Sequence, residues 1–134
     1  MKERKNITVY RVIYGDCDSM DIVYYANYLR FFEIGRTELL RELGLTYKEV
    51  EGMGFFLPVT ETFLRYLKPA QYDDLLTIET AVGFVKKASS RFDYIIYRGQ
   101  EDIIVQGYTV HACLDGEKRV VRFPDLMLNI LRGE

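Results

Sequence analysis

Three carboxylates, Asp16, Asp18 and Asp21, lie close together between an apolar run and the start of a long amphipathic stretch. This spacing places an acid beside the predicted N-terminus of a helix, where backbone N–H groups have no partner within the helix. Such groups can hold the oxyanion that develops when a carbonyl is attacked, while a nearby carboxylate supplies or activates the nucleophile. The segment 15–28 therefore predicts an acyl-transfer site.

The other reactive residue types do not suggest a competing site. His111 is the only histidine, so one chain cannot easily assemble a Ser-His-Asp triad or a histidine-rich metal site. Cys17 is flanked by acids, which are expected to raise the pKa of its thiol and leave it inert. Cys17 and Cys113 cannot make a disulfide framework, so reduced thiols are expected. We expect neither a metal nor a cofactor.

Composition limits the class of protein. The chain has 134 residues, of which 49% are hydrophobic, as expected for a single domain over residues 1–134 that gains from contacts with other subunits. A net charge of −2 with scattered cations does not favour a nucleic-acid partner. Residues 1–6 are charged rather than apolar, and no window is long enough to span a membrane. These features predict a cytoplasmic protein.

The rest of the pattern predicts an α+β fold. Alternating β-branched and aromatic residues predict a strand at 7–14, and a Pro-free run with helical spacing predicts a helix over 25–43 that ends at Gly44. After a short segment at 46–50, strands are predicted at 57–67, 74–85, 90–98, 103–114 and 118–123, followed by a helix from Pro124 to Leu131. An antiparallel sheet of these strands needs the long helix to cover its apolar face.

Gly35 stands in the middle of the predicted long helix. A glycine there costs about 1 kcal/mol relative to alanine in an exposed helix. Its presence indicates that another part of the chain packs closely at this point, as when a helix is pressed onto a sheet.

Two blocks of sequence identify a family. The first block reads Gly15-Asp16-Cys17-Asp18, then an aliphatic pair, two aromatic residues and Asn27-Tyr28, and it continues through Arg36–Leu40. The second block is Tyr66–Leu76. In this order, the blocks resemble the 4-hydroxybenzoyl-CoA thioesterase family of hotdog-fold enzymes over nearly the whole chain.

The resemblance implies a curved antiparallel sheet wrapped around one long central helix. It also implies dimers that pair their sheets edge to edge, as a homodimer or homotetramer with active sites at the subunit interfaces. The implied reaction is hydrolysis of a short-chain or aromatic acyl-CoA to the free acid and coenzyme A, with coenzyme A as part of the substrate.

The resemblance also implies roles for particular residues. Asp18 takes the position of the catalytic carboxylate, as nucleophile or general base, and the backbone N–H of Tyr25 that of the group that polarises the thioester carbonyl. Lys86 and Lys87 fall where some members bind the phosphates of coenzyme A. Asp21 replaces a glycine found in many members, so a different turn is expected there.

Alternatives remain for the site and for the function. Asp16 is more readily interpreted as structural, and Glu33, three residues before Arg36, is a minor alternative catalyst or one half of an ordinary ion pair. The acyl carrier could instead be a carrier protein. The chain could also be a non-catalytic acyl-CoA-binding hotdog module, because a fold does not determine a function.

Overall fold

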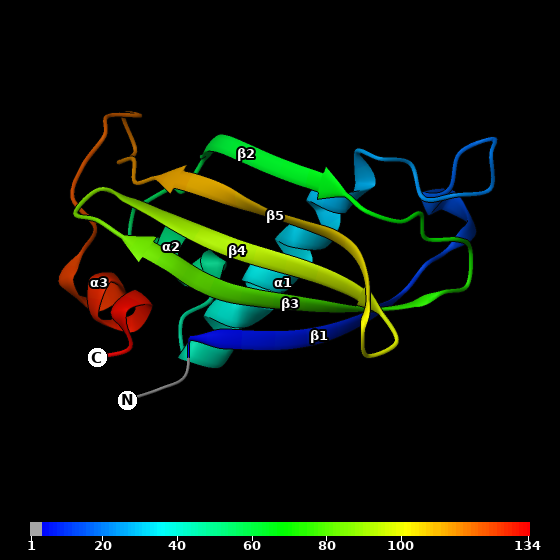
Figure 1. The fold of residues 1–134 in the computed structure, drawn as a ribbon. Helices are drawn as coiled ribbons and strands as arrows, with labels where there is room; N and C mark the ends of the chain where they lie inside the picture. Colours follow the sequence, from blue (N-terminus) through cyan, green and yellow to red (C-terminus); the bar gives the residue numbers. More distant parts are fainter. Residues whose placement is uncertain (1–3) are drawn as a thin grey trace.

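A computed structural model describes residues 4–134; residues 1–3, part of the charged N-terminal stretch, lie outside the described residues. The described strands are all antiparallel and form one sheet in the order β1-β3-β4-β5-β2 (Figure 1). They are β1 (Lys5–Arg11), β2 (Val59–Tyr66), β3 (Leu75–Val85), β4 (Ser89–Arg98) and β5 (Asp102–Ala112). The central strands β3 and β4 alternate buried and partly exposed residues, as expected when one face of a sheet is covered.

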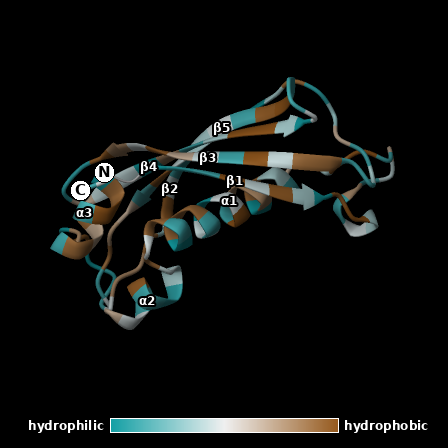
Figure 2. Cartoon of the chain, turned by 90° about the horizontal axis from the view of Figure 1, so that it is seen from below, coloured by the Kyte–Doolittle hydropathy of each residue, from teal (hydrophilic) through white to brown (hydrophobic). Residues whose placement is uncertain are grey.

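The long helix α1 (Asn27–Leu43) covers that face. Its buried side chains pack against the sheet, and the ring of Phe32 stacks on the ring of Tyr94 in β4 at 4.0 Å between centroids. The helix ends at Gly44, which adopts the left-handed conformation typical of a helix stop. No described helix covers the other face of the sheet (Figures 1 and 2).

Two short helices lie at the same end of the sheet as the C-terminus of α1 (Figure 1). Helix α2 (Tyr47–Gly52) begins with a capping box, in which Thr46 and Glu49 satisfy each other's backbone N–H groups. Helix α3 (Asp125–Arg132) follows Pro124, as predicted. At the opposite end, a single-turn 3-10 helix, η1 (Tyr14–Asp16), follows β1.

One predicted strand was wrong, and several predicted boundaries differ by one to three residues. The run 118–123 forms no strand, only an isolated bridge between Leu114 and Val120. The first residues of this run belong to a turn in which the Asp115 carboxylate accepts hydrogen bonds from the backbone N–H groups of Glu117 and Arg119. Beyond the turn the N–H of Val121 donates to the carbonyl of Cys113, so the run pairs over too few residues to form a strand. Strand β1 ends at Arg11 rather than at residue 14, and α1 begins at Asn27 rather than at residue 25.

The close approach predicted at Gly35 is confirmed. A Cβ atom on this residue would lie 2.8 Å from Cγ2 of Ile78 and closer still to the hydroxyl of Thr80, both in β3. Thr80 is buried, and its hydroxyl has no hydrogen-bond partner among the described residues. The missing side chain of Gly35 therefore sets how near α1 lies to the sheet.

We expect Gly35→Ala to destabilise the fold even though alanine favours helices. Overpacking against β3 is expected to lower the free energy of unfolding by about 1 to 3 kcal/mol, measured by urea denaturation. Gly52→Ala in α2 is the matched control, because a Cβ atom there meets nothing within 4 Å. Equal stability of the two variants would contradict the close contact.

Candidate active site

Asp18 lies on a small hairpin between η1 and α1. Cys17 bridges to Val23, and the N–H of Asp18 donates to the carbonyl of Ile22 at 2.9 Å. One carboxylate oxygen of Asp18 accepts from the N–H of Met20 at 2.8 Å. The other oxygen has no hydrogen-bond partner among the described residues, so this half-buried carboxylate keeps one oxygen available.

Asp21 closes the tip of this hairpin, with its N–H donating to the carbonyl of Asp18 at 3.0 Å. Its φ angle is 64°, in the left-handed region that favours glycine and that Asp tolerates better than most residues. Position 21 is therefore a glycine-type position in this chain as well. The turn expected to differ because of Asp21 has the conformation that a glycine would prefer.

Asp16 holds the loop together. The residue is 1% exposed, and its carboxylate accepts hydrogen bonds from the hydroxyl of Tyr10 in β1 at 2.8 Å and from the N–H of Ile13 at 2.9 Å. It also pairs with the guanidinium of Arg30 in α1. Because each carboxylate oxygen has a donor, this buried group is satisfied as a structural element, as predicted.

The segment before α1 is fixed by the backbone of the same residue. The carbonyl of Asp16 accepts from the N–H of Tyr24 at 2.9 Å and from the side-chain amide of Asn27 at 2.8 Å. A turn follows, in which the N–H of Asn27 donates to the carbonyl of Tyr24. The first residue of α1 is therefore tied back to the loop that carries Asp18.

The N–H of Tyr25 lies at the front of α1 and has no hydrogen-bond partner among the described residues. Ala26 occupies the N-cap position and provides no side-chain cap. This agrees with the sequence, in which no Ser, Thr or Asp stands at the predicted start of the helix. The Tyr25 amide is therefore free to bind an oxygen, with the positive end of the helix dipole behind it.

The two sequence blocks meet in space. The N–H of Val23 donates to the carbonyl of Ala70 at 2.8 Å, and Ile22 bridges to Gln71. Arg98 holds the second block, because its guanidinium donates to the carbonyl of Pro69 and to the carboxylate of Asp74. The hairpin of the first block therefore rests on the loop before β3.

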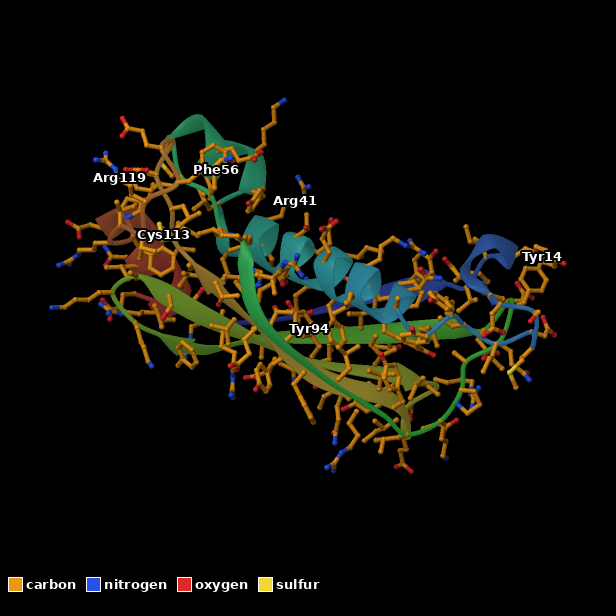
Figure 3. All side chains as sticks on the ribbon, turned by 90° about the horizontal axis from the view of Figure 1, so that it is seen from above. Tyr14, Arg41, Phe56, Tyr94, Cys113 and Arg119 are labelled. Atoms are coloured by element: carbon orange, nitrogen blue, oxygen red, sulfur yellow. The ribbon has the colours of Figure 1, made fainter. Side chains whose placement is uncertain are left out.

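Asp18 and Tyr25 line two different hollows of this chain. Asp18 borders a hollow of about 460 Å³ with Tyr14, Cys17, Ser19 and Asp21. Tyr14 marks this end of the molecule in Figure 3, far from Phe56 and Arg119. Tyr25 borders a hollow of about 250 Å³. This second hollow is lined by Ile22, Val23, Tyr25, Tyr28, Tyr66, Leu67, Lys68 and Pro69.

The structure does not bring Lys86 and Lys87 to Asp18 within one chain. Both lysines are exposed on the turn between β3 and β4, at the end of the sheet near α3, whereas Asp18 lies at the opposite end (Figure 1). The ammonium of Lys86 lies 4.7 Å from the ring centroid of Phe84.

The other reactive residues have structural contacts. Glu33 has a side chain that is 67% exposed and lies 3.6 Å from Arg36, as in the ordinary ion pair considered above. His111 is buried between the carbonyl of Leu57 and the hydroxyl of Thr109, and burial lowers its pKa to about 4. A neutral, hydrogen-bonded imidazole of this kind supports the predicted structural role.

Cys17 does not have the environment of a nucleophile. Burial, followed by the fields of the neighbouring carboxylates, raises the pKa of its thiol, as the sequence predicted. Cys17 and Cys113 are both free.

Two contacts at the site were not predicted. Arg30 in α1 pairs with Asp16, and the hydroxyl of Tyr66 at the end of β2 donates to the carbonyl of Tyr25 at 3.1 Å. Tyr66 and Tyr25 are 41 residues apart, so no local spacing signals this contact. The only indication was that both residues fall in the two blocks that identified the family.

The thioesterase-like superfamily matches residues 12–131 of this chain. The chain belongs to this superfamily. The acyl-CoA thioesterase YbgC of Haemophilus influenzae is 38% identical to this superfamily member over 117 residues, which cover 85% of each chain. The predicted family and the thioester-hydrolase class are confirmed.

Solved structures of other proteins have the same fold. The hypothetical protein TT1821 from Thermus thermophilus superposes with a TM-score of 0.91 at 28% identity, over 95% of this superfamily member and 97% of that chain. The 4-hydroxybenzoyl-CoA thioesterase of Pseudomonas sp. strain CBS-3 gives a TM-score of 0.84 at 24% identity, over 95% and 99% of the two chains. The hotdog fold is confirmed. In the described part of this superfamily member, no helix has the length and apolar character needed to cross a membrane.

We expect Asp16→Asn to unfold the loop more readily, because an amide provides one acceptor oxygen where several donors now converge. The free energy of unfolding should fall by about 1 to 3 kcal/mol, measured by urea denaturation. Asp21→Asn is a matched control on the same loop, since asparagine also tolerates a positive φ angle. If both variants were as stable as the native protein, Asp16 would not hold the loop.

Proposed function

We propose that this chain hydrolyses short-chain or aromatic acyl-CoA thioesters to the free acid and coenzyme A. The observation that carries the proposal is that an Asp18 carboxylate with one available oxygen lies on a hairpin tied to a helix start whose Tyr25 amide is unpaired. The superfamily match and the names of its relatives support the same reaction.

In the proposed mechanism, the Tyr25 N–H binds the thioester oxygen and stabilises the negative charge that develops on it. Asp18 acts in one of two ways. As general base, it removes a proton from a water molecule that attacks the carbonyl carbon; as nucleophile, it attacks directly and forms a mixed anhydride that water then hydrolyses. In both routes the carbon–sulfur bond breaks and the sulfur of coenzyme A leaves with a proton.

We further propose that the active site is completed by a second copy of the chain, in a homodimer or homotetramer. Strand β2 is an edge strand with an unpaired outer side, and every residue in it except Leu64 is exposed. Val59 and Thr62 of β2 line a hollow with Leu29 and Glu33 of α1, so this edge offers apolar surface as well as backbone hydrogen bonds. Pairing two β2 edges would continue one sheet into the next.

A second subunit would also explain how the two lysines, Lys86 and Lys87, come close to an active site. Lys86 and Lys87 lie at the opposite end of their own chain from Asp18, and the surroundings of Asp18 are acidic and unsuited to phosphates. We therefore propose that these lysines bind the coenzyme A phosphates of a site whose Asp18 belongs to another subunit. The two free cysteines support a location for this reaction in the cytoplasm.

We expect Asp18→Asn to lower turnover by about 100-fold or more, the effect of removing a general base or nucleophile. Release of free thiol is measured over a panel of short, branched, medium and aromatic acyl-CoA substrates. Asp73→Asn is the control for loss of a carboxylate, because Asp73 is an exposed aspartate in the loop just before β3.

The outcomes separate the alternatives. Native turnover by Asp18→Asn would refute the assignment of Asp18. A native protein that binds acyl-CoA but releases no thiol from any substrate would favour a non-catalytic binding module. Preference for the same acyl group on a carrier protein would favour a carrier-protein thioesterase.

We expect the double variant Lys86→Ala, Lys87→Ala to raise KM for acyl-CoA by about fivefold to tenfold without changing kcat, because it removes charge-assisted contacts to phosphate. KM for the corresponding acyl-pantetheine, which has no nucleotide, should not change. Lys48→Ala, an exposed lysine in α2, is the control.

Mixing subunits tests which chain provides the lysines. Hybrids of Asp18→Asn subunits with lysine-variant subunits contain one fully native site if the lysines come from the partner. Random exchange in a two-fold dimer then restores native KM at about a quarter of the sites. If the lysines serve the Asp18 of their own chain, no native site forms and KM stays high.

A further inference from the structure

We infer that Tyr66 is a positioning residue for the oxyanion site: its hydroxyl holds the carbonyl of Tyr25 and thereby orients the Tyr25 N–H toward the thioester. This inference rests on the proposed function, because it gives Tyr66 a role in the same reaction. Tyr66 itself is not placed in contact with the reacting atoms.

The peptide groups around Tyr25 need an external anchor. Tyr25 lies before the first residue of α1, on a turn, and its side chain is largely exposed. Tyr24 and Asn27, on either side of this turn, are held by hydrogen bonds to the carbonyl of Asp16. Tyr24 donates through its N–H and Asn27 through its side-chain amide. For the backbone of Tyr25, the hydrogen bond from the Tyr66 hydroxyl to the carbonyl at 3.1 Å is the only one among the described residues.

Tyr66 is well placed to act as that anchor. It is the last residue of β2, which pairs with β5 along its length, and the end of β2 reaches the start of α1 (Figure 1). The strand therefore connects the sheet to the turn that precedes α1. The anchor comes from the sheet rather than from the helix whose N-terminus binds the oxygen.

The Tyr66 ring is held independently of its hydroxyl. Its centroid lies 5.7 Å from that of Tyr28, which is buried, and 6.4 Å from that of Tyr25, which is nearly perpendicular to it. A tyrosine hydroxyl is protonated at neutral pH, and partial desolvation raises the pKa of Tyr66 further, so this hydroxyl can act as a donor. Removing only the hydroxyl should therefore leave the packing in place.

The hydrogen bond lies on the wall of a space large enough for part of a substrate. Tyr25, Tyr28 and Tyr66 line the same hollow of about 250 Å³. A shift of the Tyr25 peptide would move its N–H relative to any carbonyl that this N–H binds. The contact with the oxyanion depends on a geometry that is set before the reaction. Loss of the hydrogen bond from Tyr66 should therefore destabilise the transition state more than the bound substrate.

Tyr66→Phe is the test, with Tyr97→Phe in β4 as the control for loss of a tyrosine hydroxyl away from the site. We expect Tyr66→Phe to lower kcat by about fivefold to twentyfold, the value of one hydrogen bond, with KM within about twofold of native and an unchanged thermal midpoint. An S-alkyl-CoA thioether, which has no carbonyl, should bind native and Tyr66→Phe protein equally. Tyr97→Phe should match the native protein in every measurement.

Three results would overturn the inference. The first is a native kcat for Tyr66→Phe. The second is a rise in KM that accounts for the whole loss of kcat/KM, and the third is weaker binding of the thioether by Tyr66→Phe. Either of the last two would mean that Tyr66 binds substrate directly. Asp18→Asn, assayed beside these variants, distinguishes failure of the role of Tyr66 from failure of the proposed active site. If Asp18→Asn is inactive while Tyr66→Phe is native, only the role of Tyr66 fails; if Asp18→Asn is native, the proposed site itself fails.

Discussion

The carboxylate of Asp16 is buried where β1, the hairpin and α1 converge, and the geometry of the whole site depends on how it is satisfied. A buried carboxylate without donors would be costly, so the donors around it must stay in place. They come from Tyr10 in β1, the backbone of Ile13 and Arg30 in α1. Because the backbone carbonyl of the same residue fixes Tyr24 and Asn27, one residue sets both the path of the hairpin and the start of the helix.

A second constraint acts from the middle of α1. Gly35 lets the helix approach the side chains of Ile78 and Thr80 in β3, so the helix axis lies at a fixed distance from the sheet. One helical turn before Gly35, the ring of Phe32 stacks on the ring of Tyr94 and so joins the helix to β4 as well. Together with Asp16, these contacts place the front of α1 beside the end of β2.

Local pattern was sufficient for the parts of the fold whose causes are local. The alternation of β3 and β4 and the helical spacing of α1 are repeated along each element itself, and Gly35 was noticed because a glycine is unfavourable within a helix, although the atoms that crowd it come from β3. The run 118–123 resembled a strand in composition, but its first residues belong to the turn at Asp115 and the rest pairs with the chain only near Leu114. The hydrogen bond between Tyr66 and Tyr25, and the position of Lys86 at the far end of the sheet from Asp18, depend on how distant segments pack together. Local sequence does not indicate that packing.

The position of β2 links two properties that are usually considered separately. Its outer edge is unpaired, and its last residue is bonded to the peptide of Tyr25. Any chain that adds a strand to this edge also stiffens the support of that peptide. A substitution anywhere along β2 that loosens this strand would therefore also loosen the support of the Tyr25 carbonyl, even though it touches neither Tyr25 nor the start of α1.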